Sequence, residues 1–353
     1  MGLFLTETMM AARLHGIGAE LRIDHVPVPR IAPNDILLEV KASGICHSDL
    51  NYRNGVAPVA KLPITLGHEI AGVIARKGHR VNDLRLGERV FVHYVSSCGR
   101  CVYCRTNREN YCRSYRMIGK DVDGGFAQYS VVPAACAVRL PETIPFEQGA
   151  VMGCAVSTAY HALRRGRVQP RDTVVVIGVG GLGMHAVQLA KKTFRAGRVI
   201  AVDRFEWKLK EAKNFGADRI VNAATEDLTG AVSRMTSGML ADVVLDFVGS
   251  DKTNQQGIGC VGKGGRLVLV GIGARSMTVS PYGTIIGKEI EIVGVDDHLK
   301  KELYQLLLLL RSGKLDLSRS VTHRIALENI NEGFRILEDE NEEPVRVVVL
   351  AGK

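Results

Sequence analysis

The chain has 353 residues, and its 46 Lys+Arg and 37 Asp+Glu leave a formal charge of +9 at neutral pH. Its length predicts two or three domains, and 46% hydrophobic with 24% charged residues exclude a disordered chain. The low aromatic content of 5% argues against nucleic-acid binding by base stacking.

We find no signal peptide and no run of about 20 apolar residues, so we expect a soluble cytoplasmic protein without a membrane partner. In that compartment, the eight cysteines are expected to be metal ligands or buried thiols. Two of them, Cys136 and Cys260, match no motif, and we interpret them as buried structural thiols.

The N-terminal part of the chain, up to Leu140, predicts a β-rich domain. Short β-type segments at residues 35–41, 69–75 and 89–95 are separated by prolines and turns, as in a barrel or sandwich. Residues 145–160 then predict a helix.

From Arg171 onward the pattern changes to buried strands that alternate with helices. Continuous apolar runs occupy residues 173–178, 198–203, 242–246 and 265–271, as is typical of parallel strands covered on both faces. Apolar residues recur at helical spacing after Gly181, and the alternation predicts a doubly wound α/β unit. From Leu299 to the C-terminus we expect one helix, at 301–311, and one strand, at 345–350.

A glycine-rich turn lies between the first of these strands and its helix. The turn consists of Gly178, Gly180, Gly181, Leu182 and Gly183. Glycines there allow backbone N–H groups to approach a dinucleotide pyrophosphate at the helix N-terminus. Asp203 ends the next strand and would accept hydrogen bonds from the ribose hydroxyls, which favours NAD over NADP. Arg204 follows it and could accept a 2′-phosphate, so NADP stays open.

Four cysteines lie close together in the sequence and predict a metal site. They are Cys98, Cys101, Cys104 and Cys112, and four thiolates in such proximity suit a tetrahedral structural zinc. The spacing fits an iron–sulfur cluster poorly. Residues 76–120 around this lobe (about 95–113) hold eleven Lys+Arg against three Asp+Glu, so they carry most of the chain's net positive charge.

A second set of metal-binding residue types is dispersed along the chain. Cys46, His68 with Glu69, and Cys154 lie far apart in the sequence, so spacing alone does not group them.

Resemblance to a known family groups these residues. The chain carries, in this order, Gly-Ile-Cys-His-Ser-Asp at 44–49, Gly67-His-Glu69, the four-cysteine lobe, Gly-Gly-Phe-Ala at 124–127, Cys-Ala-Val-Ser-Thr at 154–158, the glycine-rich turn and Asp203. This order is similar to that of the zinc-dependent medium-chain alcohol dehydrogenases. The chain resembles this family along essentially its whole length.

The resemblance implies a GroES-like β-rich catalytic domain (residues 1–156) followed by a Rossmann doubly wound parallel-sheet domain (157–297). The chain then returns to the catalytic domain (298–353), and the active site lies in the cleft between the domains. Assembly into a homodimer or homotetramer is also implied, and residues 290–295 are our candidate sheet edge for it.

The resemblance also implies two zinc ions per subunit and a role for each motif residue. Cys46, His68 and Cys154 hold the catalytic zinc, with Glu69 as an alternate ligand or a neighbouring group, and the four-cysteine lobe holds the structural zinc. Ser48 hydrogen-bonds the substrate oxygen, Asp49 orients His68, His47 faces the pyrophosphate, Thr158 lies beside the nicotinamide, and Arg204 and Lys208 belong to the coenzyme site.

One position departs from the family. Many members have a histidine three residues after the Ser/Thr of the proton relay, whereas this chain has Asn51. An amide cannot accept and release a proton near neutral pH. Our hypothesis is that protons leave from Ser48 and the ribose to water, or through His47.

We therefore predict an NAD-dependent alcohol dehydrogenase that interconverts a primary or secondary alcohol with its aldehyde or ketone. The alternatives are a family member that prefers NADP or that acts on a polyol or amino alcohol. A more distant alternative, a zinc-ribbon nucleic-acid-binding protein, is motivated by the basic four-cysteine lobe but is disfavoured by the glycine-rich turn and the second metal set.

Overall fold

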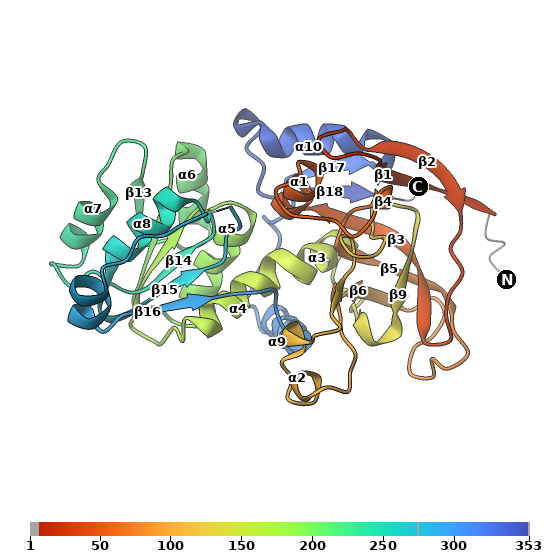
Figure 1. Ribbon diagram of the computed structural model, residues 1–353, viewed down its shortest axis with the longest axis horizontal. Coiled ribbons are helices and arrows are strands. Elements are labelled where there is room, and N and C mark those ends of the chain that lie inside the picture. Colours follow the sequence, from red (N-terminus) through yellow and green to blue (C-terminus); the bar gives the residue numbers. More distant parts are fainter. Residues whose placement is uncertain (1–6, 274, 352–353) are drawn as a thin grey trace. The chain divides into compact units, whose positions relative to one another are not determined.

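The protein is described here by a computed structural model, which covers residues 7–273 and 275–351 (Figure 1). The chain divides into two compact units. Unit 1 comprises the residues up to Cys154, His298–Gln305 and the residues from Leu317 on, and unit 2 comprises Ala155–Asp297 and Leu306–Asp316.

Unit 1 is built mainly from β-strands. They are β1 (Thr8–Leu14), β2 (Arg22–Pro27), β3 (Asp35–Ile45), β4 (Ile64–Thr65), β5 (Glu69–Lys77), β6 (Arg89–Val92), β7 (Val95–Ser96), β8 (Arg116–Met117), β9 (Tyr129–Pro133), β10 (Ala137–Arg139), β17 (His323–Ala326) and β18 (Val347–Leu350). The main sheet has the order β10-β6-β5-β3-β18-β17, with β9 also paired to β3. Smaller sheets are β2-β1-β4 and β7-β8.

Strand β3 is the centre of this domain. Its consecutive residues Ile36, Leu37 and Leu38 are completely buried, so apolar groups cover both of its faces. The antiparallel pairing of β3 with β5 places Gly44 opposite Glu69, and this register brings the ends of the two strands together.

The helices of unit 1 are short. They are α1 (His47–Arg53), α2 (Val102–Arg105), α3 (Phe146–Val151) and α10 (Ile330–Glu338), and a π-helical turn (Met152–Val156) follows α3. Single π turns inside helices are frequent at functional sites.

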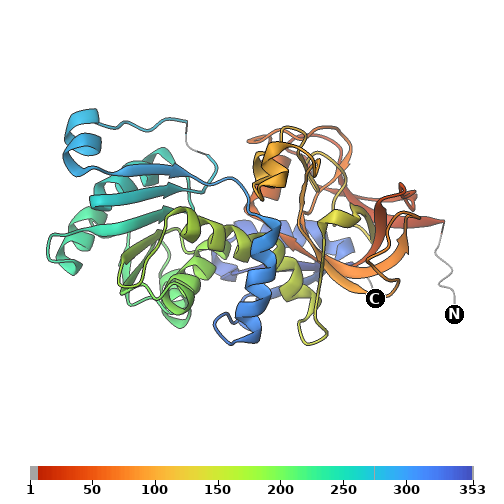
Figure 2. The same cartoon turned by 90° about the horizontal axis from the view of Figure 1, so that it is seen from below.

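Unit 2 contains one six-stranded parallel sheet (Figures 1 and 2). Its strands are β11 (Thr173–Ile177), β12 (Arg198–Asp203), β13 (Arg219–Asn222), β14 (Ala241–Asp246), β15 (Val261–Leu269) and β16 (Glu291–Gly294). The order β13-β12-β11-β14-β15-β16 is 3-2-1-4-5-6 when the strands are numbered within the unit, which is the order of dinucleotide-binding sheets. Strand β16 lies at one end of it.

Helices connect these strands. They are α4 (Ser157–Arg165), α5 (Gly181–Gln188), α6 (Glu206–Asn214), α7 (Leu228–Met235) and α8 (Asp251–Cys260), and residues of α9 (Lys300–Arg311) belong to both units. Helices α4, α5 and α6 pack in one group and α7 packs on α8. The predicted fold class, a β-rich domain with a doubly wound α/β domain, is confirmed.

The helix expected at 145–160 is confirmed, and it contains the π turn and extends to Arg165. Two local predictions were wrong. The strand expected at 89–95 breaks at His93 and Tyr94, because β6 ends at Val92 and β7 begins at Val95. The segment after Leu299 holds a second helix, α10, and a second strand, β17, in addition to the expected elements.

Within the described ranges, no helix combines the length and the apolar character that crossing a membrane requires.

Candidate functional site

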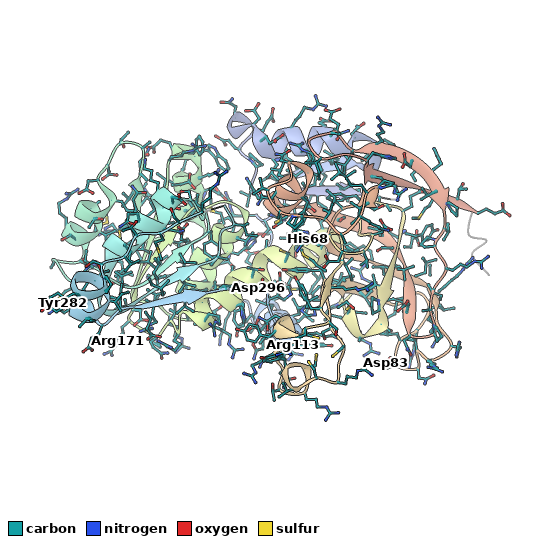
Figure 3. The ribbon with its side chains drawn as sticks, in the orientation of Figure 1. His68, Asp83, Arg113, Arg171, Tyr282 and Asp296 are labelled. Carbon is teal, nitrogen blue, oxygen red and sulfur yellow. The ribbon has the colours of Figure 1, made fainter. Side chains whose placement is uncertain are left out.

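Four dispersed residues come together in the interior of unit 1. The ligand atoms of Cys46, His68, Glu69 and Cys154 all lie within 4.8 Å of one another, and all four side chains are buried. Figure 3 labels His68, which is 1% exposed. The fold of unit 1 therefore brings together residues that lie far apart in the sequence.

Each residue of this group is placed by a strand end or a helix turn. Cys46 caps the N-terminus of α1 directly after β3, and His68 precedes Glu69, the first residue of β5. The β3–β5 pairing brings these two strand ends together. Cys154 lies in the π-helical turn after α3.

Asp49 holds two members of the group in place. The Cys46 N–H donates to Asp49 Oδ2 over 2.9 Å, and Asp49 Oδ1 accepts the Gly67 N–H at 3.2 Å. The same Oδ1 lies 3.5 Å from Nδ1 of His68. A fully buried carboxylate at this distance can fix the orientation of the His68 ring, which is the role expected of Asp49.

Nearby charges control the protonation of these ligands. A hydrogen bond from Cys154 lowers the pKa of the Cys46 thiol well below its usual value, against the effect of burial and with help from His68 and Arg346. Burial would lower the pKa of His68, but the Asp49 carboxylate reverses this and raises that pKa. These neighbours therefore favour the thiolate of Cys46, the form in which cysteine binds metals, whereas the contact with Cys46 and burial raise the pKa of Cys154.

Arg346 is a member of this site that the sequence did not reveal. Its guanidinium is 2% exposed and forms an ion pair with Oε1 of Glu69, which is completely buried. Burial raises the pKa of Glu69 to about 7, although Arg346 opposes the shift. An arginine just before an apolar strand gives no indication of a distant carboxylate partner.

Gly44 leaves room for the Glu69 carboxylate. A Cβ atom at Gly44 would lie 2.0 Å from Oε2 of Glu69, so any side chain there would displace the carboxylate. This close approach explains a glycine within the otherwise buried strand β3.

The donor set fits a divalent metal ion. Two thiolates and one neutral imidazole balance the charge of Zn²⁺, and zinc prefers sulfur and nitrogen ligands. Among the described residues, both ring nitrogens of His68 are buried without a hydrogen-bond partner, and a metal ion bound at Nε2 would provide one of them with a partner.

The neighbours of Cys46 in helix α1 differ in exposure. Ser48 is half-buried, with its Oγ 3.8 Å from Cys46 Sγ, whereas His47 is exposed. Asn51, one turn further along, is half-buried. Ser48 therefore contacts the metal-binding group through the Cys46 sulfur.

The four-cysteine lobe forms the second metal-binding group. The Sγ atoms of Cys98, Cys101, Cys104 and Cys112 lie within 4.8 Å of one another, with Cys101–Cys104 at 3.5 Å and Cys98–Cys104 at 3.9 Å. Zinc–sulfur bonds of about 2.3 Å in a tetrahedron separate the sulfurs by about 3.8 Å. These distances therefore fit a four-thiolate zinc site.

Backbone N–H groups support the thiolate form of Cys98 in this lobe. Hydrogen bonds from the N–H of Arg100, then of Cys101, lower the pKa of Cys98 to about 6. Arg113, labelled in Figure 3, and the neighbouring Arg116 are exposed, so part of the basic charge lies at the lobe surface.

The glycine-rich turn in unit 2 depends on close backbone contacts. Gly178 has φ +83°, and a Cβ atom on Gly183 would lie 2.0 Å from the Gly178 carbonyl oxygen. A Cβ on Gly180 would meet nothing within 4 Å, so the surface beside this N-cap of α5 is open. Open backbone at a helix N-terminus suits a pyrophosphate.

Asp203 is fixed beside this turn. Its Oδ2 accepts the Val179 N–H at 3.0 Å, and its Oδ1 accepts the N–H groups of Arg204 and Phe205 at 2.8 and 3.2 Å. The guanidinium of Arg204 and Nζ of Lys208 lie 4.5 and 4.7 Å from the centre of the Phe205 ring. One carboxylate and two cations therefore lie next to the end of β12.

Thr158 belongs to α4, directly after the π turn. Its side chain is 7% exposed, and its hydroxyl has no hydrogen-bond partner among the residues described. A buried hydroxyl of this kind is available to a bound ligand.

Comparison with known proteins covers nearly the whole chain. Residues 32–142 match the alcohol dehydrogenase GroES-like domain, and residues 181–311 match the zinc-binding dehydrogenase family. The chain is 34% identical to an alcohol dehydrogenase of Geobacillus stearothermophilus, covering 92% of this chain and 95% of that one. It is 35% identical to the NAD-dependent alcohol dehydrogenase of Sulfurisphaera tokodaii, with 94% and 97% covered.

Solved structures show the same fold. The alcohol dehydrogenase of Aeropyrum pernix is 34% identical with a TM-score of 0.88, covering 97% of this chain and 99% of that one. An Escherichia coli alcohol dehydrogenase solved with NADH has 28% identity and a TM-score of 0.90. A Sinorhizobium meliloti protein solved with NADP has 28% identity and a TM-score of 0.89, and each of these two matches covers 98% of this chain and 100% of the other.

Proposed function

Because the chain belongs to the zinc-dependent medium-chain alcohol dehydrogenase family and is therefore an oxidoreductase, we propose that it interconverts a primary or secondary alcohol with its aldehyde or ketone, with NAD as coenzyme. The observation that carries this proposal is the convergence of Cys46, His68 and Cys154 in one buried group. A zinc ion held by these three residues supplies Lewis acidity, which lowers the pKa of an alcohol hydroxyl. NAD supplies the hydride acceptor.

The protein's own residues orient the site and move the proton. Asp49 fixes the His68 ring and the Cys46 backbone. The Oγ of Ser48 lies next to Cys46 Sγ. It accepts the hydroxyl proton of the substrate and at the same time gives up the serine's own hydroxyl proton. Because Asn51 cannot relay protons near neutral pH, the exposed His47 imidazole or water receives the proton next.

Glu69 is the remaining acidic group of the metal site. Its pairing with Arg346 offsets its charge, so we propose that it acts as a neighbouring group, available as an alternate ligand, rather than as a permanent one. We further propose that the four-cysteine lobe holds a second zinc that stabilises the fold.

The coenzyme site supports NAD over NADP. In our proposal, the glycine-rich turn binds the pyrophosphate, Thr158 contacts the nicotinamide, and Asp203 accepts the ribose hydroxyls. The Asp203 carboxylate is held by three backbone N–H groups and would repel a 2′-phosphate. The competing preference for NADP rests on Arg204 and Lys208, whose cations lie beside Phe205.

The class of substrate, like the coenzyme, has an alternative. Relatives of similar identity include the L-idonate 5-dehydrogenase of Vitis vinifera and the sorbitol dehydrogenase of Arabidopsis thaliana, at 34% and 36%. A polyol or amino-alcohol substrate is therefore the alternative function. The zinc-ribbon nucleic-acid hypothesis loses its basis, because the four cysteines lie inside the matched GroES-like domain.

We also propose that the protein is a homodimer or homotetramer. Strand β16 lies at one end of the parallel sheet, and an edge strand leaves hydrogen-bonding groups available to a second copy.

Steady-state assays on protein of measured zinc content test the main proposal. Simple alcohols, polyols and amino alcohols are each supplied with NAD and with NADP, and coenzyme reduction is followed by absorbance. We expect turnover of alcohols with NAD that is lost when zinc is removed. Turnover that is independent of zinc would contradict the proposal, and a polyol or NADP preference would select one of the alternatives.

A further inference from the structure

Tyr94 contacts two of the proposed metal ligands. Its ring centre lies 5.0 Å from that of His68 at an interplanar angle of 76°, and its hydroxyl oxygen lies 3.9 Å from Cys154 Sγ. The side chain is only 2% exposed. One tyrosine therefore adjoins both the imidazole and a thiol of the metal-binding group.

The break between β6 and β7 places Tyr94 there. The His93 N–H donates to the Cys136 carbonyl at 2.8 Å, and the Tyr94 carbonyl accepts the Ile118 N–H at 3.0 Å, so the backbone is fixed outside the main sheet. A Cβ atom on Gly153 would lie 2.9 Å from the Val92 carbonyl oxygen. The π-helical turn that carries Cys154 thus packs closely against the end of β6.

A second histidine supports the Tyr94 ring. The centre of the His298 ring lies 5.1 Å from that of Tyr94 at 76° and 4.9 Å from that of His93 at 74°. Nε2 of His93 lies 3.3 Å from the His298 carbonyl oxygen. Edge-on contacts between rings fix their relative orientation, so Tyr94 is braced between His298 and His68.

We propose that Tyr94 is a positioning residue of the catalytic metal centre. Its ring holds the His68 imidazole in its ligating orientation, and its hydroxyl donates a hydrogen bond to the Cys154 sulfur. A metal-bound thiolate has no proton to donate, so the tyrosine O–H must be the donor in this contact. This inference rests on the proposed zinc site.

The hydrogen bond would alter the electronic character of the centre. A donor to a ligating sulfur withdraws electron density from it, so the sulfur donates less charge to the metal and the Lewis acidity of the metal increases. Groups that hydrogen-bond to metal ligands typically change metal affinity about 10–100-fold when they are removed.

Cobalt substitution tests the hydrogen bond directly, because thiolate-to-cobalt charge-transfer bands respond to the charge on sulfur. Spectra are recorded for wild type and Tyr94→Phe, which keeps the ring and loses only the hydroxyl. The spectrum of Cys46→Ser is subtracted from each to remove the contribution of the four-cysteine lobe. The matched control is Tyr52→Phe, which removes a buried tyrosine hydroxyl 3.3 Å from the sulfur of Met117, a residue outside both metal-binding groups.

We expect a shift of the band to lower energy in Tyr94→Phe and no shift in Tyr52→Phe. An unchanged band in Tyr94→Phe, or equal shifts in both variants, would overturn the role of Tyr94. Zinc-dependent turnover of wild type would in that case leave the proposed function intact. If wild type has no band beyond that of Cys46→Ser, the zinc centre and the proposed function fail together.

Discussion

The guanidinium of Arg346 and the carboxylate of Glu69 form an ion pair that is almost completely closed to solvent. The pair joins the residue before strand β18 to the first residue of β5 and lies next to Cys46, whose pKa Arg346 helps to lower. A buried charge without its partner is much more costly than an exposed one, so the two residues depend on each other.

Removing the cation should destabilise the fold strongly. We expect Arg346→Met to lower the free energy of unfolding by about 3–5 kcal/mol, because Glu69 would remain as an unpaired buried carboxyl group. Adding Glu69→Gln to this variant should restore part of the loss. Arg324→Met breaks the half-exposed pair with Glu147 and should cost less than about 1 kcal/mol. Denaturant unfolding measures all three, and equal losses for both arginines would contradict this interpretation.

Replacing a proposed catalytic ligand should separate turnover from coenzyme binding. We expect Cys46→Ser to abolish alcohol oxidation and to lower the zinc content from two ions to one. NADH binding, followed by fluorescence, should be nearly unchanged because the glycine-rich turn and Asp203 belong to the other unit. A variant that keeps both zinc ions and full activity would show that Cys46 is not a ligand.

The four-cysteine lobe should behave differently. We expect Cys112→Ala to lower the melting temperature and the zinc content, because the binding energy of a structural zinc contributes directly to folding. Cys136→Ala is the control, since Cys136 is a buried cysteine outside both metal-binding groups. A folded Cys112→Ala protein with an unchanged melting temperature would contradict a structural role for this zinc.

Coenzyme preference should depend on Asp203. We expect Asp203→Gly to raise the KM for NAD by about ten- to a hundredfold, as the loss of one hydrogen bond to a charged group predicts, and to raise the KM for NADP far less. Asp218→Asn alters another carboxylate of unit 2, one paired with Lys191, and should leave both constants nearly unchanged. Equal increases for the two coenzymes in Asp203→Gly would refute the assignment.

His93 should make stability depend on pH below neutrality. Burial lowers the pKa of His93 to about 4, and the neighbouring groups are the His298 carbonyl, Glu109, Lys300 and Glu302. Its neutral form is therefore favoured in the fold. The unfolded chain binds a proton near pH 6.5 that the folded protein does not, so stability is fully present above pH 6.5 and decreases as the pH falls toward 4.

The loss attributable to His93 over this range is about 3 kcal/mol. His93→Gln should remove it, so the unfolding free energies of wild type and variant should converge as the pH falls. Denaturant titrations of the metal-free proteins between pH 4 and 8 measure this difference. Parallel curves would show that His93 is protonated equally in both states.

Local motifs made the fold and part of the site predictable. The four cysteines and the glycine-rich turn are each contiguous in sequence, and the apolar runs of β11 and β12 predict buried parallel strands without knowledge of the rest. Cys46, His68 and Cys154, in contrast, were grouped only by family resemblance. Their proximity depends on strand pairing over long sequence separations.

What the sequence did not predict also depends on long-range packing. The pairing of Arg346 with Glu69 joins residues that lie far apart in the sequence, and no local pattern indicates it. Tyr94 lies in a run of β-type residues, so the strand break that fixes it is set by contacts with Cys136 and Ile118. Helix α10 was missed although Ile330, Phe334 and Leu337 have helical spacing and are buried, because the helix is short and contains Gly333.

The two metal-binding groups differ in how much chain their ligands enclose. The cysteines of the four-cysteine lobe close a short loop, whereas Cys46 and Cys154 enclose most of the β-rich domain. Closing the longer loop costs about 2 kcal/mol more in chain entropy, and its ligands meet only after β3 and β5 have paired. During folding, a metal ion could therefore bind the four-cysteine lobe while the chain is still largely open, whereas one at the Cys46 group could bind only after the sheet has formed.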